Sequence, residues 1–176
     1  MRPLRAFPLA LSVGTDICHI ARIHAILRGP RRGRFVRRIL APEELAAADD
    51  RLPGLTAEGG LVAGDGDGDG DGGAVRKTGL WKMAVFVAGR FAAKEAAIKA
   101  HAQQHRRLGW HDIVIERRRC SSNGSSSSGP PVARIKAGEG EGEDEDESAL
   151  VSISHDGDYA TAVCIAYSGG RDSTQP

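Results

Sequence analysis

One stretch of the chain, residues 82–102, constrains the fold most because its composition predicts a single long helix. The stretch is rich in alanine, the residue with the highest helix propensity, and contains no proline. Phe86, Ala93, Ala97 and Ala100 recur at helical spacing and form a narrow apolar stripe. Small side chains in that stripe permit close packing, so we expect the helix to lie directly on a sheet.

Five apolar segments predict the strands of that sheet, and three shorter periodic segments predict small helices. Strands are expected at residues 9–17, 113–115, 132–135, 150–154 and 159–167, and helices at residues 19–27, 32–40 and 42–48. A tight turn, His155-Asp156-Gly157-Asp158, joins the last two strands and makes them antiparallel neighbours. The predicted fold class is α+β, with an antiparallel sheet packed on the long helix.

Three low-complexity segments interrupt these elements, at residues 56–73, 121–129 and 138–147. The first alternates Asp and Gly, the second is mostly serine, and the third is a Gly/Glu/Asp run. Such compositions bury too little apolar surface to offset the entropy of ordering them. We therefore expect a single domain over residues 1–176 with three flexible insertions and a loose tail at residues 168–176.

Composition and charge exclude several classes of protein. The formal net charge is +1, and the three cysteines show no C-x-x-C spacing that would indicate a zinc site or a disulfide framework. No apolar run reaches the roughly 18 residues of a membrane span, so we expect a soluble protein with no membrane partner. Arg2 and Arg5 precede any acidic residue, which favours the mitochondrion slightly over the cytoplasm. The insertions are typical of a eukaryotic source.

Charged residues from two predicted elements form a candidate site. Asp16 ends the first strand, and Glu95 and Lys99 lie one turn apart on the long helix. Two carboxylates converging from a strand and a helix offer oxygen ligands suited to Mg²⁺, with a diphosphate supplying further oxygens. Arg90 and Lys94 would help to neutralise the phosphates. Taken alone, the helix residues also fit an ordinary exposed ion pair worth about 0.3 kcal/mol.

A serine and a histidine end the predicted strand at residues 150–154. Ser154 and His155 could form a nucleophilic pair, although no G-x-S-x-G motif supports that reading. His155 could equally be a turn residue that is hydrogen-bonded to its neighbours. The two residues by themselves leave both alternatives open.

Three motifs in order resemble those of the holo-acyl-carrier-protein synthase family of 4′-phosphopantetheinyl transferases: GTDI at residues 14–17, RFAAKEA at 90–96 and VSISH at 151–155. The resemblance continues through IARI at 20–23, RFVRRIL at 34–40 and PEEL at 42–45. It covers nearly the whole chain apart from the insertions. The chain is thus similar to a free-standing family member of the fungal, mitochondrial type. Met1 and the polar tail favour this over a domain excised from a fatty acid synthase.

The resemblance implies an enzyme of fatty acid biosynthesis that moves 4′-phosphopantetheine from coenzyme A to a serine of an apo acyl carrier protein. It implies that Asp16 and Glu95 bind Mg²⁺ and that Lys99 stabilises phosphate charge. Either Glu95 or a metal-bound water would accept the serine proton. The coenzyme A contacts implied are Arg90, Lys94, Lys99, Ser154 and His155.

Arginines near the start of the chain provide the expected docking surface for the carrier protein. By complementary charge, Arg22, Arg34, Arg37 and Arg38 would face an acidic helix of the carrier. The wider basic run also includes Arg28, Arg31 and Arg32, and could instead be only a solvated face. Nucleic acid is not expected, because the run holds one aromatic residue, Phe35, and no nucleic-acid-binding module.

The resemblance further implies a homotrimer with active sites between subunits. An alternative is a catalytically inactive module that only docks on carrier proteins, against which the joint presence of Asp16, Glu95 and Lys99 argues. Two departures from the family pattern stand out. Residues 101–109 replace a glycine-rich turn, and Ala41 replaces a helix-capping residue, which weakens that helix start by about 1 kcal/mol.

Overall fold

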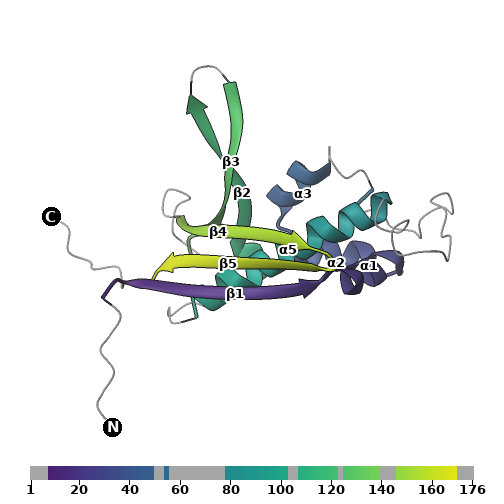
Figure 1. Ribbon diagram of the computed structural model, residues 1–176, viewed down its shortest axis with the longest axis horizontal. Coiled ribbons are helices and arrows are strands. Elements are labelled where there is room, and N and C mark those ends of the chain that lie inside the picture. Colours follow the sequence, from purple (N-terminus) through teal and green to yellow (C-terminus); the bar gives the residue numbers. More distant parts are fainter. Residues whose placement is uncertain are drawn as a thin grey trace, which may run out of the picture.

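The computed structural model describes residues 8–49, 54–55, 78–102, 107–122, 125–138 and 146–169. Five antiparallel strands form one sheet in the order β1-β5-β4-β3-β2, and a long helix, α5, crosses one face of it (Figure 1). The strands are β1 Leu11–His19, β2 Ile113–Ser122, β3 Ser125–Ile135, β4 Glu147–Asp156 and β5 Tyr159–Tyr167. The helices are α1 Ile20–Arg28, α2 Arg32–Ile39, α3 Pro42–Asp49, α5 Gly79–Ala100 and the short 3₁₀ helix η1 Trp110–Asp112. The predicted fold class is confirmed.

Helix α5 begins at a capping residue that lies upstream of the predicted start. The Thr78 hydroxyl accepts a hydrogen bond from the Trp81 amide at 3.2 Å, which satisfies one of the unpaired donors of the first turn. From there the helix runs for 22 residues. Its small buried side chains pack against β1 and β5, as the alanine stripe predicted; they include Ala92, Ala93, Ala96, Ala97 and Ala100.

Strand β1 lies against α5 with almost no space between the two backbones. A Cβ atom added at Gly14 would lie 2.0 Å from the Ala96 carbonyl oxygen and 2.6 Å from the Ala100 amide nitrogen. No residue other than glycine fits there without displacing the helix or the strand. The contact fixes where Asp16, two residues further along β1, lies relative to α5.

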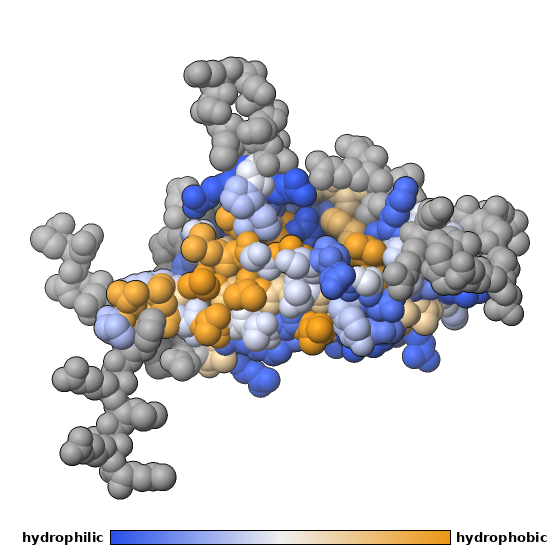
Figure 2. All heavy atoms as spheres, in the orientation of Figure 1, coloured by the Kyte–Doolittle hydropathy of each residue, from blue (hydrophilic) through white to orange (hydrophobic). Residues whose placement is uncertain are grey.

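The sheet has one face covered by α5 and one face that carries exposed apolar side chains. In β5 the residues alternate, and Ala160, Ala162, Cys164 and Ala166 are buried. Figure 2 shows apolar side chains gathered on the opposite face. Among the described residues, the exposed large apolar side chains lie on or beside β1, β4 and β5, and are Leu9, Leu11, Val13, Ile17, Leu150, Tyr159, Val163, Ile165 and Tyr167.

The second low-complexity segment departs from the prediction. Residues 121–129 were expected not to fold, yet Ser121 pairs with Ser126 and Ser122 with Ser125 in the β2–β3 ladder. The ladder continues past a register shift between Arg117 and Arg119, and the two strands form a ribbon that projects from the rest of the molecule (Figure 1). Antiparallel pairing requires only backbone groups, so a serine-rich composition is compatible with it.

The other insertions fall mainly outside the described residues. These are residues 56–73, residues 139–145 of the third insertion, and the tail beyond Gly169. Some residues of these segments are described. Glu147, the last residue of the third insertion, begins β4, and the amide of Ser168, the first residue of the tail, donates to the Ala10 carbonyl at 2.9 Å. None of the described helices is long and apolar enough to span a membrane.

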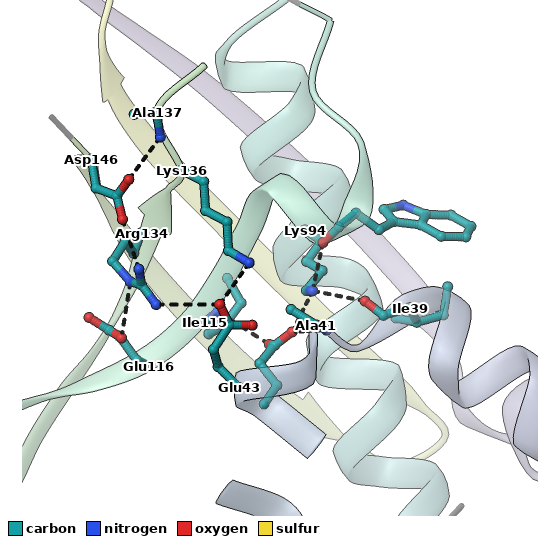
Figure 3. A network of polar contacts seen from close by, with 12 residues as sticks. Ile39, Ala41, Glu43, Lys94, Ile115, Glu116, Arg134, Lys136, Ala137 and Asp146 are labelled. Atoms are coloured by element: carbon teal, nitrogen blue, oxygen red, sulfur yellow. Dashed lines mark hydrogen bonds and ion pairs between the residues drawn. The ribbon is translucent and has the colours of Figure 1, made fainter. Parts of the chain in front are cut away.

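Charged side chains tie the start of α3 to β3 and to the residue before β4 (Figure 3). Arg134 donates to Asp146 at 2.7 Å, and Lys136 pairs with Glu43 at 2.7 Å. The Ala137 amide donates to Asp146 at 2.8 Å and, with Arg134, lowers the pKa of that carboxyl. The hydrogen bond from Lys136 lowers the pKa of Glu43. Both carboxyls therefore favour the folded state when they are ionised.

This network predicts a loss of stability in acid. Because both carboxyls have lowered pKa values when folded, their contribution is fully present above their ordinary values of 3.8 and 4.5. It is lost as the pH falls through the lowered values. Urea unfolding between about pH 2 and pH 6 should show a smaller loss in Asp146→Asn than in the unaltered chain. Asp156→Asn, at the end of β4 and outside this network, is the control. Equal losses in both variants would contradict the account.

The contact at Gly14 predicts a strong effect of the smallest substitution. Gly14→Ala should lower the free energy of unfolding by about 3 kcal/mol, since its methyl group meets backbone atoms that cannot rotate away. The matched control is Gly79→Ala, where an added Cβ meets nothing within 4 Å. Urea unfolding of the two variants checks this, and similar stabilities would show that β1 and α5 are not in such close contact.

Candidate active site

Asp16 from β1 and Lys99 from the last turn of α5 lie side by side. The Lys99 ammonium donates to Asp16 Oδ1 at 2.8 Å and to the Thr15 carbonyl oxygen at 2.9 Å. The Lys99 side chain is 52% exposed and that of Asp16 is 16% exposed, so the ammonium can also meet a ligand from solvent. Sequence spacing had paired Lys99 with Glu95. The close approach of β1 at Gly14 gives it Asp16 as a partner instead.

The second oxygen of Asp16 has no partner among the described residues. Asp16 Oδ2 has an accessible surface below 1 Å² and accepts no hydrogen bond there. A buried anionic oxygen that lacks a donor is destabilising, and such an atom is a reason to look for a missing cation. The donor chemistry of this oxygen fits a hard divalent ion such as Mg²⁺.

Glu95 is the other carboxylate expected to bind a metal. Its Oε1 accepts a hydrogen bond from the Trp110 indole nitrogen at 2.7 Å. The described residues contain no group of three or more histidine, cysteine or acidic side chains placed to hold an ion. Two protein carboxylates are nevertheless enough for Mg²⁺, which usually takes its remaining ligands from water and substrate phosphates. The residues present therefore fit this ion.

Lys94 has a structural role where the sequence predicted a phosphate contact. Its side chain is fully buried, and the ammonium donates to the carbonyl oxygens of Ile39 at 2.8 Å and Trp110 at 2.7 Å (Figure 3). It also forms an ion pair with Glu44. Burial lowers the pKa of Lys94, and the Glu44 carboxylate opposes that shift. Helical spacing placed Lys94 one turn from Arg90 but could not reveal that its ammonium points into the protein.

Glu44 is an important residue whose role the sequence reasoning missed. The sequence places it only in the PEEL segment, at the start of a predicted helix. In the structure its carboxylate accepts the Ala41 amide at 2.9 Å and the Ile115 amide at 3.2 Å, in addition to pairing with Lys94. The bond to Ala41 supplies half of a capping box, which offsets the missing side-chain cap. The spacing of a glutamate three residues after the cap was the available signal.

Arg90 lies in the middle of α5, and Ser154 and His155 lie at the end of β4. Ser154 and His155 are successive strand residues, so their side chains point to opposite faces of the sheet. His155 Nε2 lies 3.3 Å from the Val85 carbonyl oxygen, and a Cβ added at Gly89 would lie 2.8 Å from that nitrogen. Arg90, next along α5, lies over the Phe86 ring at 5.0 Å, and its Nε is 3.8 Å from Glu44. Ser154 is exposed.

The predicted residues thus form two groups rather than one. Asp16, Glu95 and Lys99 belong to the C-terminal half of α5 and the strand beside it. Of the nucleotide-binding candidates, Arg90 lies nearer the N-terminus of α5, and His155 contacts Val85, which is nearer still to that end. Within one chain, Lys99 contacts Asp16, and His155 contacts Val85.

The four docking arginines are exposed on α1 and α2. Arg22 contacts Cys18 Sγ at 3.5 Å, and Arg38 lies over the Trp110 ring at 5.0 Å. Arg32, part of the wider basic run, is buried instead and donates to the carbonyl oxygens of Leu55, at 3.3 Å, and Gly54. Burial lowers the pKa of Arg32. Arg32 therefore binds the chain after α3 and is not part of a solvated face.

The buried ion pair predicts unequal effects of two adjacent substitutions. Glu44→Gln should lower the free energy of unfolding by about 3 kcal/mol, because Lys94 would remain charged, buried and without its counterion. Glu43→Gln removes a half-exposed partner of Lys136 and should lower the free energy of unfolding by about 0.5 kcal/mol. Chemical denaturation measures both. The double variant Glu44→Gln with Lys94→Met should recover part of the loss, and no recovery would argue against coupling of the two residues.

Comparison with known proteins agrees with these features. Residues 12–164 match the family described as the 4′-phosphopantetheinyl transferase superfamily. The 4′-phosphopantetheinyl transferase B, mitochondrial, of Aspergillus fumigatus is 34% identical over 166 residues, covering 91% of this chain and 95% of its own length. A holo-[acyl-carrier-protein] synthase of Anaeromyxobacter dehalogenans is 29% identical over 166 residues, covering 92% and 99%.

Solved structures give the same result at the level of the fold. An ACPS-CoA complex from Chronobacterium ammoniagenes has a TM-score of 0.52 and 26% identity, covering 89% of this chain and 96% of that one. The holo-ACP-synthase from Plasmodium yoelii has a TM-score of 0.56 at 23% identity, covering 90% and 95%. The matched region includes all three sequence motifs, with Asp16 and Glu95 in them, and also Lys99. The chain belongs to the 4′-phosphopantetheinyl transferase superfamily.

Proposed function

We propose that this chain is a holo-[acyl-carrier-protein] synthase that transfers the 4′-phosphopantetheine group of coenzyme A to a serine of an apo acyl carrier protein. The proposal rests on the Asp16 carboxylate, in which one oxygen pairs with Lys99 and the other is buried with no partner among the residues that the structure describes. A carboxylate that pairs with a cationic side chain and keeps a second, cation-seeking oxygen suits phosphoryl transfer. The family and the relatives of the same name support the assignment.

Asp16 and Glu95 are the residues that would hold Mg²⁺. When bound, the ion neutralises negative charge on the diphosphate of coenzyme A. Lys99 is placed to do the same from the protein side, because its half-exposed ammonium already lies 2.8 Å from Asp16. Charge neutralisation and positioning make up most of catalysis in phosphoryl transfer, so these three residues supply the principal chemistry.

The transfer converts the phosphoanhydride of coenzyme A into a phosphodiester on the carrier protein. The oxygen of the carrier serine bonds to the β-phosphorus of coenzyme A, and the bond from that phosphorus to the bridging oxygen breaks. The bridging oxygen leaves with 3′,5′-adenosine bisphosphate, and the serine proton must be accepted. Of the two bases that the resemblance allows, Glu95 is the one that this chain supplies, and we assign it the proton.

Arg90, Ser154 and His155 would bind the nucleotide end of coenzyme A. Arg90 and His155 carry nitrogen donors suited to phosphate and adenine groups, and Ser154 carries an exposed hydroxyl one residue before His155. Within one chain these residues lie apart from Asp16 and Lys99. A site shared between two subunits would bring the two groups onto one coenzyme A molecule.

A homotrimer would supply such shared sites. The sheet face opposite α5 exposes many large apolar side chains, such as Val13, Ile17, Val163 and Ile165, and soluble monomers rarely expose a continuous patch of this kind. Covering that face with further copies of the chain removes the apolar surface from water. Exposed Arg22, Arg34, Arg37 and Arg38 on α1 and α2 then remain available to an acidic carrier protein. The named mitochondrial relative supports a mitochondrial location.

Intact mass spectrometry of apo acyl carrier proteins tests the proposal. Incubation with coenzyme A, Mg²⁺ and this protein should add about 340 Da to the carrier, the mass of one phosphopantetheinyl group. Asp16→Ala and Glu95→Ala should each reduce the rate at least about 100-fold, since each removes a proposed metal ligand. Asp156→Ala, which removes an exposed carboxylate at the end of β4, is the matched control and should retain the rate.

The outcome also separates the alternative function. Suppose that several carrier proteins bind through Arg34 and Arg38 and none of them gains mass. That result would show that the protein is an inactive docking module. Transfer that persists in both Asp16→Ala and Glu95→Ala would contradict the proposed metal site.

A further inference from the structure

Trp110 touches the proposed metal ligand Glu95 and is itself held on three sides. Its indole N–H donates to Glu95 Oε1 at 2.7 Å. The Phe91 ring lies 5.7 Å from the Trp110 ring, and the Arg38 guanidinium lies over it at 5.0 Å. Its carbonyl oxygen accepts a hydrogen bond from the buried Lys94 ammonium at 2.7 Å. Main chain and ring are therefore both fixed relative to α5.

An indole is suited to orient a carboxylate. It has one N–H donor and no acceptor, so Trp110 can offer Glu95 only one interaction, with one geometry. A donor to a carboxylate forms a charge-assisted hydrogen bond, which is stronger than a neutral one. With Oε1 fixed in this way, the Glu95 side chain loses freedom of rotation and its second oxygen keeps a defined position.

We infer that Trp110 is a positioning residue for Glu95, holding Oε1 so that the second carboxylate oxygen is available to a divalent cation. The inference rests on the proposed function, because it assumes that Glu95 is a metal ligand. Groups that hydrogen-bond to metal ligands typically change metal affinity or activity by about 10- to 100-fold when they are replaced. Loss of the Trp110 N–H should thus weaken metal binding and leave the fold intact.

The buried position of Lys94 fits this arrangement. By bonding to the Trp110 carbonyl and to Ile39 at the end of α2, Lys94 fixes the loop that carries the indole. Lys94, a lysine inside the RFAAKEA motif, thereby affects the position of its neighbour Glu95 indirectly, by holding Trp110. This role requires no contact between Lys94 and a phosphate. The motif then supplies both the metal ligand and the support for the residue that orients it.

The test uses the two tryptophans of the chain as a matched pair. Trp110→Phe keeps a ring between Phe91 and Arg38 and removes the N–H, and replacement of Trp110 by the isosteric benzothienylalanine removes only the N–H. Trp81→Phe removes the other indole, which is buried and whose ring centre lies 5.4 Å from that of the His24 ring. Mn²⁺ binding in the presence of coenzyme A is measured by electron paramagnetic resonance, together with thermal midpoints and the Mg²⁺ dependence of transfer.

The inference predicts Mn²⁺ affinity about 10-fold weaker in both Trp110 variants, unchanged affinity in Trp81→Phe, and transfer that recovers at high Mg²⁺. Thermal midpoints of the benzothienylalanine variant and the unaltered chain should coincide. Unchanged Mn²⁺ affinity in the Trp110 variants, with normal transfer by the unaltered chain, would overturn the role of Trp110 alone. Failure of the unaltered chain to bind Mn²⁺ would overturn the metal site, and the inference with it.

Discussion

The backbone contact between β1 and α5 at Gly14 sets the position of the whole site. Because no side chain separates the two elements there, Asp16 and Lys99 come within hydrogen-bonding distance from positions 83 residues apart. The alanines of α5 extend the same close approach along the helix and onto β5. A larger residue at any of these points would move the strand away from the helix and separate the carboxylate from the ammonium.

A second, polar layer connects the small helices to this core. Glu44 and Lys94 are both buried, and between them they contact the residue before α3, the end of α2, the start of β2 and the residue that opens η1. Paired ions in a protein interior are retained only where their hydrogen bonds are well satisfied, as they are here. The consequence is functional, because the loop fixed in this way presents the Trp110 indole to Glu95.

The sequence predicted the elements well where the local pattern and the tertiary environment agree. The α5 helix, the β4–β5 hairpin and Asp16 near the end of β1 follow from composition and alternation. The pairing of Asp16 with Lys99 was not predicted and depends on the close packing at Gly14. Spacing could not tell that Lys94 points inward or that Arg32 is buried, since both side chains are long and polar. It also could not predict the contact between Trp110 and Glu95, which depends on how the loop after α5 returns to the helix.

The prediction from composition was wrong for the paired residues of the serine-rich segment at 121–129, for a related reason. Entropy arguments treat a polar segment as isolated, but β2 and β3 enter it already paired, and each further residue needs only one backbone partner. The same limit applies to the apolar sheet face, whose exposure becomes visible only when the strands are placed in order.

The most direct measurement is a crystal structure of the protein grown with coenzyme A and Mn²⁺, with anomalous scattering used to locate the ion. Our account predicts one anomalous peak within bonding distance of Asp16 Oδ2 and a Glu95 oxygen, with the coenzyme A diphosphate on its other side and Lys94 still bound to Glu44. An ion bound elsewhere, or a diphosphate held by Lys94 with Asp16 left unliganded, would contradict it.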